Sequence, residues 1–331
     1  MEEKMNTPEL AVLSSSGAPR TGHLKILRAL GREEYEKYAD ARRLVTSFVD
    51  SYMKFTMTRK SYREYIDLLR AYDEKYSSER PLDEVQAMAI KQEVNRRLRG
   101  FLTELRSFVD HAVAELEEEY GGNEADEVQS FLNERSQVFD SSPSYRLVNK
   151  LRDYALHRNV VIQHMTYRIV PNRETGRPQS FLSFHVIRDE LLQASFNWTK
   201  HVPPYLERLP ERFKLDPHIE LARYDLEKMH VAFVATKLPK AKEAASYINK
   251  LAGSVEEPGA PCVVFNAPGR DPAGSDVQDF AVTIDRIPTE IATLIENLPK
   301  PDELRKLPGL EINFVDPEGK PIELSNSEPI P

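Results

Sequence analysis

Two residues in one short segment, Arg152 and His157, have side chains suited to chemistry at a phosphate group. Histidine titrates near neutral pH, so it suits proton transfer. Arginine keeps its positive charge and offers a planar set of N–H donors to phosphate oxygens. Asp153 follows the arginine directly and adds a carboxylate to the same segment. These residue types make the segment the first place to look for a function.

Four residues separate Arg152 from His157 in a helix predicted over residues 144–158, and this spacing resembles the signature motif of the HEPN superfamily. The resemblance covers the helical layout of about residues 81–159, with residue identity only at these few positions. It implies a metal-independent endoribonuclease, a toxin or defence component, whose active members dimerise so that two motifs share one site. By this resemblance His157 would accept the proton of an RNA 2′-hydroxyl. Arg152 would stabilise charge on the scissile phosphate, and Asp153 would orient either partner.

Helix geometry sets a condition on this hypothesis. Residues five apart on an ideal helix point about 140° away from each other. Arg152 and His157 therefore converge on one phosphate only if the helix ends or distorts at His157, or if two subunits bring two motifs together. A second interpretation stays open: Arg152 pairs with a carboxylate of a neighbouring helix, while His157 and Arg158 favour the negative end of the helix dipole. An exposed basic cleft would favour the first interpretation, and ion pairing of the arginine would favour the second.

Basic residues near a predicted β-hairpin suggest where RNA would bind. The hairpin candidates are Arg168, Arg173 and Arg177, and a second cluster comprises Arg96, Arg97 and Arg99. The hairpin candidates follow the Arg152–His157 segment directly in the sequence, which makes them the better phosphate-binding surface. The alternative for each cluster is a solvated surface with mixed charges. The formal net charge of −8 means that any RNA site must be a local basic patch.

The elements that must position these residues predict a mainly α fold. We expect an antiparallel helical bundle with an inserted β-hairpin and a small α+β C-terminal region. The predicted parts are a disordered or loosely docked tail over 1–30, a bundle over 31–255 with the hairpin at about 160–188, and a small irregular region over 256–331. Long amphipathic helices joined by short polar turns carry this prediction.

Apolar residues at spacings of three and four predict the helices, and β-branched runs predict the strands. The predicted helices cover about 33–72, 81–120 with a stop at Gly121-Gly122, 126–139, 144–158, 189–198, 217–251 with a break at Pro239, and 288–298. The predicted strands outside the hairpin cover 262–265, 280–284, 310–315 and 322–324.

Several classes of protein do not fit the sequence. Cys262 is the one cysteine, so an internal disulfide is excluded and a cytoplasmic setting is expected. No histidine spacing typical of zinc ligands occurs, and we expect neither a metal nor another cofactor. No apolar run is long enough to span a membrane. Besides RNA, the expected partners are a second copy of the chain or another protein bound through the amphipathic helices. A non-catalytic helical interaction or scaffold protein is therefore the alternative function.

Overall fold

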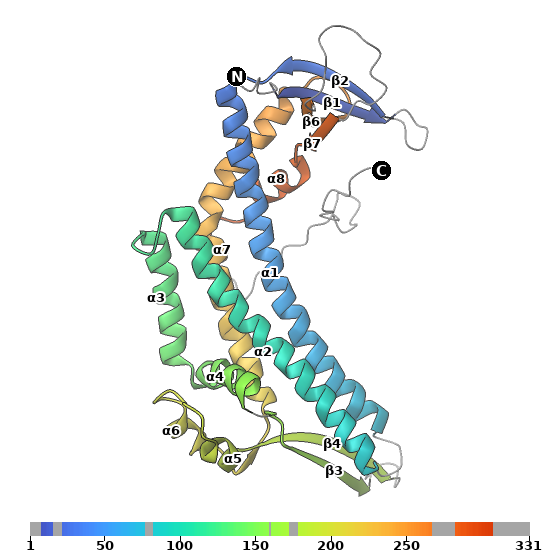
Figure 1. Ribbon diagram of the computed structural model, residues 1–331, viewed down its shortest axis with the longest axis vertical. Helices are drawn as coiled ribbons and strands as arrows, with labels where there is room; N and C mark the ends of the chain where they lie inside the picture. Colours follow the sequence, from blue (N-terminus) through green and yellow to red (C-terminus); the bar gives the residue numbers. More distant parts are fainter. Residues whose placement is uncertain are drawn as a thin grey trace, which may run out of the picture. The chain divides into compact units, whose positions relative to one another are not determined.

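The structure is a computed structural model that describes residues 8–15, 22–76, 82–158, 160–171, 178–266 and 282–306. It is mainly α with two small antiparallel sheets, as predicted (Figure 1). The helices are α1 (Arg32–Tyr76), α2 (Glu84–Tyr120), α3 (Asp126–Ser141), α4 (Pro143–His157), α5 (Arg188–Gln193), α6 (Pro203–Leu206), α7 (Asp216–Gly253), α8 (Thr289–Glu296) and α9 (Pro301–Leu304). The strands are β1 (Glu9–Ser15), β2 (Gly22–Ala29), β3 (His164–Pro171), β4 (Pro178–Ile187), β5 (Arg212–Phe213), β6 (Ala260–Asn266) and β7 (Val282–Arg286).

The chain forms two compact units. The second unit comprises Ser51–Thr236, and the first combines the residues up to Asp50 with those from Lys237 to Leu304. Helices α1 and α7 each contribute to both units. In this division β1 and β2 belong to the same unit as β6 and β7, whereas the prediction separated a bundle over 31–255 from a C-terminal region over 256–331.

In the second unit α1 and α2 run antiparallel. Thr58 near the middle of α1 donates a hydrogen bond to the Glu104 carbonyl of α2. Later in α1, Glu64 pairs with Arg97, which lies earlier in α2, at 2.5 Å. Contacts that move backward along one helix as they move forward along the other define an antiparallel pair. This is the arrangement predicted from the long amphipathic helices.

Helix α7 lies antiparallel to α1 in the same unit. Phe55 of α1 stacks on His230 of α7, and further along α1 the Tyr65 hydroxyl donates to Asp216 at 3.0 Å. The core that these helices share with α2, α3 and α4 is apolar and continuous. Its fully buried members include Phe101, Leu105, Leu151, Leu226 and Phe233.

Local signals fix the ends of α2 and α4, which carry most of the candidate site. Asp83 caps α2 by accepting from the Gln86 amide, and the Gln86 side chain accepts from the Asp83 amide in return. Gly121, with φ of 87°, ends α2 in the left-handed conformation that glycine adopts readily. Ser142 caps α4 by accepting from the Tyr145 amide at 3.1 Å, with Pro143 in the first turn.

The predicted hairpin is present as β3 and β4, with His164 opposite His185 and Val170 opposite Gln179. The short strand β5 pairs with β4 and makes a three-stranded sheet in the order β3-β4-β5. One face of the sheet joins the core of the second unit, where Leu182, Phe184 and Val186 are buried. A hairpin alone is marginal in water, so this packing is what stabilises it.

The first unit contains the sheet β2-β1-β6-β7, which corrects the predicted loose tail over 1–30. Residues 9–15 and 22–29 are strands, and Leu10 of β1 pairs with Val263 of β6. Burial of Ala11, Cys262 and Val264 explains why this segment is ordered. Of the strands predicted within the C-terminal region, β6 therefore pairs with the beginning of the chain, and β7 pairs with β6.

Pro239 does not break α7, contrary to the prediction. The helix continues from Asp216 to Gly253 with the proline inside it. Residues Val231 to Leu238 are all buried and the proline ring is exposed. Burial of the apolar residues in this segment offsets the loss of one backbone hydrogen bond, which costs ~3 kcal/mol in an exposed helix. The strands predicted at 310–315 and 322–324 lie outside the described residues.

Candidate functional site

Arg152 and Asp153 form an ion pair on α4. Arg152 Nη1 donates to Asp153 Oδ1 at 3.0 Å, and Lys150 Nζ donates to the other carboxylate oxygen at 3.0 Å. Desolvation works against ionisation of Asp153, but the two cations hold the pKa of its carboxyl below the usual value. The partner of Arg152 is thus its own neighbour, not a carboxylate of another helix. Its buried Nε has no acceptor in the described part of the chain.

His157 is the last residue of α4 and is exposed, with Arg158 at the C-cap. The helix therefore ends where the predicted mechanism requires an end. The described residues show no hydrogen bond between Arg152 and His157, and the ion pair of Arg152 points to a different partner. Within one chain the structure thus places the motif residues on one helix without joining them.

The outer face of the β3-β4-β5 sheet gathers cationic and hydroxyl side chains. Alternation along β3 puts His164, Thr166 and Arg168 on this face, opposite the core-facing residues. Their cross-strand partners on β4 are His185, Ser183 and Phe181. Arg212 on β5 pairs in register with Ile187 and reaches His164 Nε2, to which Nη1 donates at 3.3 Å. The three strands contain no carboxylate side chain.

Electrostatics confirm that these cations lie close together. Burial lowers the pKa of His185, and positive charge from Lys214, His164, Arg212 and Arg168 lowers it further. His185 Nε2 bonds Thr166 Oγ1 at 3.2 Å, while its buried Nδ1 has no partner in the described part of the chain. We call this surface, formed by His164, Thr166, Arg168, His185, Arg212 and Lys214, the basic sheet face. It is a local basic patch on an acidic protein.

The residues predicted to bind RNA have three different outcomes. Arg168 is exposed on the basic sheet face. Arg173 and Arg177 lie outside the described residues. In the other cluster, Arg96 and Arg97 both pair with Glu93, at 2.6 and 3.1 Å, so carboxylate charge offsets that basic run.

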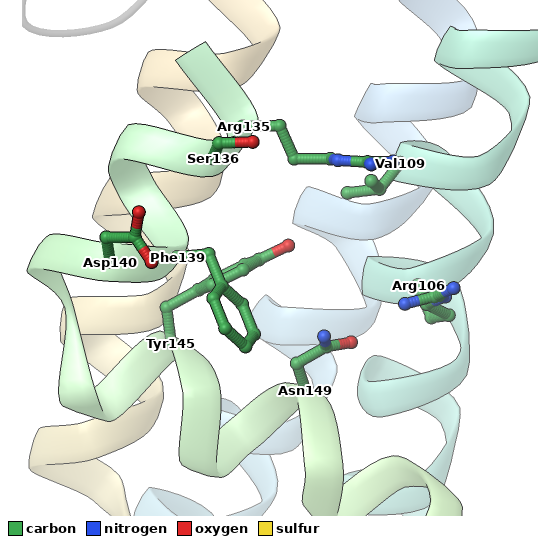
Figure 2. Close-up of a pocket in the computed structure, with 8 residues that line it drawn as sticks. All are labelled: Arg106, Val109, Arg135, Ser136, Phe139, Asp140, Tyr145 and Asn149. Carbon is green, nitrogen blue, oxygen red and sulfur yellow. The ribbon is translucent and has the colours of Figure 1, made fainter. Parts of the chain in front are cut away.

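A pocket of about 350 Å³ lies between α2, α3 and α4 in the second unit (Figure 2). Tyr145 and Asn149 of α4 line it, and they lie two turns and one turn before Arg152, respectively. Arg106 comes from α2 and Arg135 from α3, and their side chains extend toward the same space as the Tyr145 hydroxyl. The remaining lining residues are Val109, Ser136, Phe139 and Asp140.

The charges around the pocket act on Tyr145. Burial raises the pKa of its hydroxyl to about 12, although positive charge from Arg106 and Arg135 lowers it. Arg106 donates through Nε to Asp110 at 2.9 Å, and Arg135 has no ion-pair partner among the described residues. Arg146 holds the end of α3 beside the pocket, because its Nη1 donates to the carbonyls of Phe139 and Asp140 at 2.7 Å.

Sequence reasoning missed this pocket and most of the basic sheet face. Alternation from Arg168 back along β3 would have selected Thr166 and His164 for the same face. No sequence signal marks Arg212, because β5 has two residues. The pocket residues are distributed over three helices, and none of them belongs to a local motif.

The described residues contain no cluster of three or more metal-ligating side chains, and no helix among them is long and apolar enough to cross a membrane. Comparisons with protein-family models, curated proteins and solved structures found no match.

Proposed function

We propose that the protein is a HEPN-like, metal-independent endoribonuclease that binds RNA through the basic sheet face and acts as a homodimer. The basic sheet face is the observation that carries this proposal. Its lasting positive charges are Arg168 on β3, Arg212 on β5 and Lys214 directly after β5, and no carboxylate on the three strands offsets them, which favours phosphate binding. Phe181, 39% exposed and opposite Arg168, adds a ring on which an unpaired base stacks.

The position of His157 supports the catalytic part of the proposal. The histidine is exposed at the end of α4, and β3 begins seven residues later with His164 of the basic sheet face. The strand that would bind the RNA is therefore only seven residues away in the chain from the proposed general base. A second subunit would supply the arginine that the helix geometry directs away from His157.

The ion pair of Arg152 favours a second candidate, a non-catalytic helical interaction or scaffold protein. An arginine bound to Asp153, which also binds Lys150, serves helix stability without any role for a phosphate. In this case the long helices would recognise a protein partner. Exposed apolar side chains on α1 and α2, Met53, Met57, Val85 and Met88, would contribute to that contact.

Cleavage of a labelled single-stranded RNA in EDTA tests the proposal. The expected result is cutting by the wild-type protein that falls at least a hundredfold in His157→Ala and Arg152→Ala, because general-base catalysis contributes ~10²–10⁴-fold. Arg158→Ala is the matched control, since it removes a neighbouring exposed cation and should cut at the wild-type rate. No cutting by folded wild-type protein would refute the nuclease.

RNA binding by uncut protein separates recognition from catalysis. His157→Ala should bind the RNA as the wild type does, whereas Arg168→Ala and Arg212→Ala in that background should each weaken binding and reduce its salt dependence. Binding that is unchanged in both arginine variants would refute the role of the basic sheet face. If the arginine variants lose RNA binding but neither the wild type nor any variant cleaves RNA, the protein is an RNA-binding protein without nuclease activity.

A further inference from the structure

We propose that the pocket between α2, α3 and α4 binds a nucleoside monophosphate, with the phosphate held by Arg106 and Arg135 and the base beside Phe139. This site is separate from the proposed nuclease residues and does not depend on cleavage. Its volume of about 350 Å³ is at the small end of ligand sites, which suits a mononucleotide and excludes larger cofactors.

The donors of the pocket converge on one space. Figure 2 shows the Tyr145 hydroxyl facing a space with the Arg135 side chain above it, Arg106 on the opposite side and the Asn149 amide below. The positive charges of both arginines lower the pKa of the Tyr145 hydroxyl, as expected for guanidinium groups near it. Two guanidinium groups, a phenol and an amide form a donor set that matches the oxygens of one phosphate.

These donors are available to a ligand. Arg135 makes no ion pair in the described part of the chain, and Arg106 uses its Nε for Asp110 and keeps its two terminal nitrogens. The Tyr145 residue is 2% exposed, and no hydrogen bond of its hydroxyl occurs among the described residues. The hydroxyl faces the pocket, so it can donate a hydrogen bond to an anion bound there.

Three carboxylates near the pocket, Asp110, Asp225 and Asp140, are compatible with a phosphate. Asp110 is paired with Arg106 and Asp225 with Lys228, so the charge of each is partly offset. Asp140 lies on α3 at the edge of the pocket and is exposed (Figure 2). A carboxylate at the rim, away from the phosphate, suits the hydroxyl groups of a ribose.

The ring of Phe139 offers a surface on which the base of the nucleotide can stack. Phe139 lies beside Tyr145 in Figure 2 and is half-buried, so one side of its ring is open to the pocket. The Arg146 guanidinium lies 5.9 Å from this ring and also holds the backbone of residues 139 and 140. The ring is therefore fixed before a ligand arrives, and stacking of a base on it adds affinity.

Isothermal titration of the full chain with adenosine monophosphate, inorganic phosphate and adenosine tests the site. Adenosine monophosphate should bind with a 1:1 stoichiometry, phosphate more weakly, and adenosine most weakly. Phosphate binding as tight as that of the nucleotide would overturn the base contact. Absence of saturable binding by both phosphate compounds at millimolar concentration would overturn the site.

Three variants assign the binding to the pocket. Arg135→Ala should weaken nucleotide binding about tenfold or more, since it removes charge-assisted hydrogen bonds. Tyr145→Phe keeps the ring in the core and should weaken binding about threefold to tenfold. Arg99→Ala removes an exposed arginine of the same helix as Arg106 and should bind as the wild type does. Equal affinity in all three variants, with unchanged circular dichroism, would place the nucleotide elsewhere and refute the proposal.

Discussion

His230 of α7 is a buried titratable group whose protonation should destabilise the second unit. Its imidazole stacks on Phe55 with ring centroids 3.8 Å apart, and the rings of Tyr52 and Phe108 also contact it. Both ring nitrogens are buried without a hydrogen-bond partner in the described part of the chain. Burial, and then the positive charge of Arg59, lowers the pKa of His230 well below its usual value. The histidine is therefore neutral in the folded protein.

The magnitude follows from proton linkage. The folded-state pKa is depressed, so the unfolded chain binds the extra proton and stability falls as the pH drops below the unfolded pKa of about 6.5. Between pH 7 and pH 5.5 this one site should lower the free energy of unfolding by about 1.3 kcal/mol. His230→Phe keeps a ring stacked on Phe55 and removes the titration. Any repacking cost of the larger ring is independent of pH and cancels in the comparison.

Tryptophan fluorescence isolates the unit concerned. Trp198 is the single tryptophan of the sequence, and it lies in the second unit, stacked on Tyr154 with centroids 5.7 Å apart. Urea unfolding followed by this signal at pH 7 and pH 5.5 gives the free energy of unfolding of wild type and variant. His111→Gln is the control, because it removes an exposed histidine of α2. That variant should keep the wild-type pH dependence.

The reasoning is refuted if wild type and His230→Phe lose the same free energy between the two pH values. His185 and His218 also have lowered pKa values, mainly through burial, and contribute to the total pH dependence in both proteins. The predicted quantity is therefore the difference between the two proteins.

Two further changes test how buried backbone groups are satisfied. Asn95→Ala should lower the free energy of unfolding by about 2–4 kcal/mol, because Asn95 accepts from the Ile162 amide at 2.9 Å and donates to its carbonyl at 3.0 Å. Urea unfolding measures this loss, and a change below about 0.5 kcal/mol would contradict it. Gly259→Ala should destabilise the first unit by about 1–3 kcal/mol, because φ is +139° and a Cβ would lie 2.5 Å from Val12 Cγ1. Thermal unfolding by circular dichroism should show a lowered transition for Gly259→Ala and not for Gly253→Ala, where nothing lies within 4 Å; equal transitions would refute the steric argument.

Local patterns were sufficient to predict most helices and the hairpin. The apolar stripe of α2, its stop at Gly121 and the Ser142-Pro143 start of α4 are all contained within a few turns of chain. The pairing of β1 with β6, about 250 residues away, leaves no local pattern, whereas the β1-β2 hairpin is local and its short strands were missed. The continuity of α7 through Pro239 depends on burial that only the tertiary structure supplies.

The candidate site was predictable only where its chemistry is local. The sequence correctly places Arg152, Asp153 and His157 on one helix that ends at the histidine. The ion pair between the first two was not predicted, because the sequence suggested a partner on another helix. Arg212 contacts His164, and Arg135 lines a pocket with Arg106 of another helix. Neither contact could be predicted from residue spacing within one element.

The pairing of β1 with β6 has a consequence for synthesis of the chain. The first strands leave the ribosome early, but the strand that covers one edge of β1 follows about 250 residues later. At rates of ~5–20 residues per second, that edge stays open for tens of seconds or less. An open edge is a template for pairing with other chains. Chains interrupted between Thr236 and Ala260 should therefore aggregate through β1, even though residues 51–236 of the second unit have already been made.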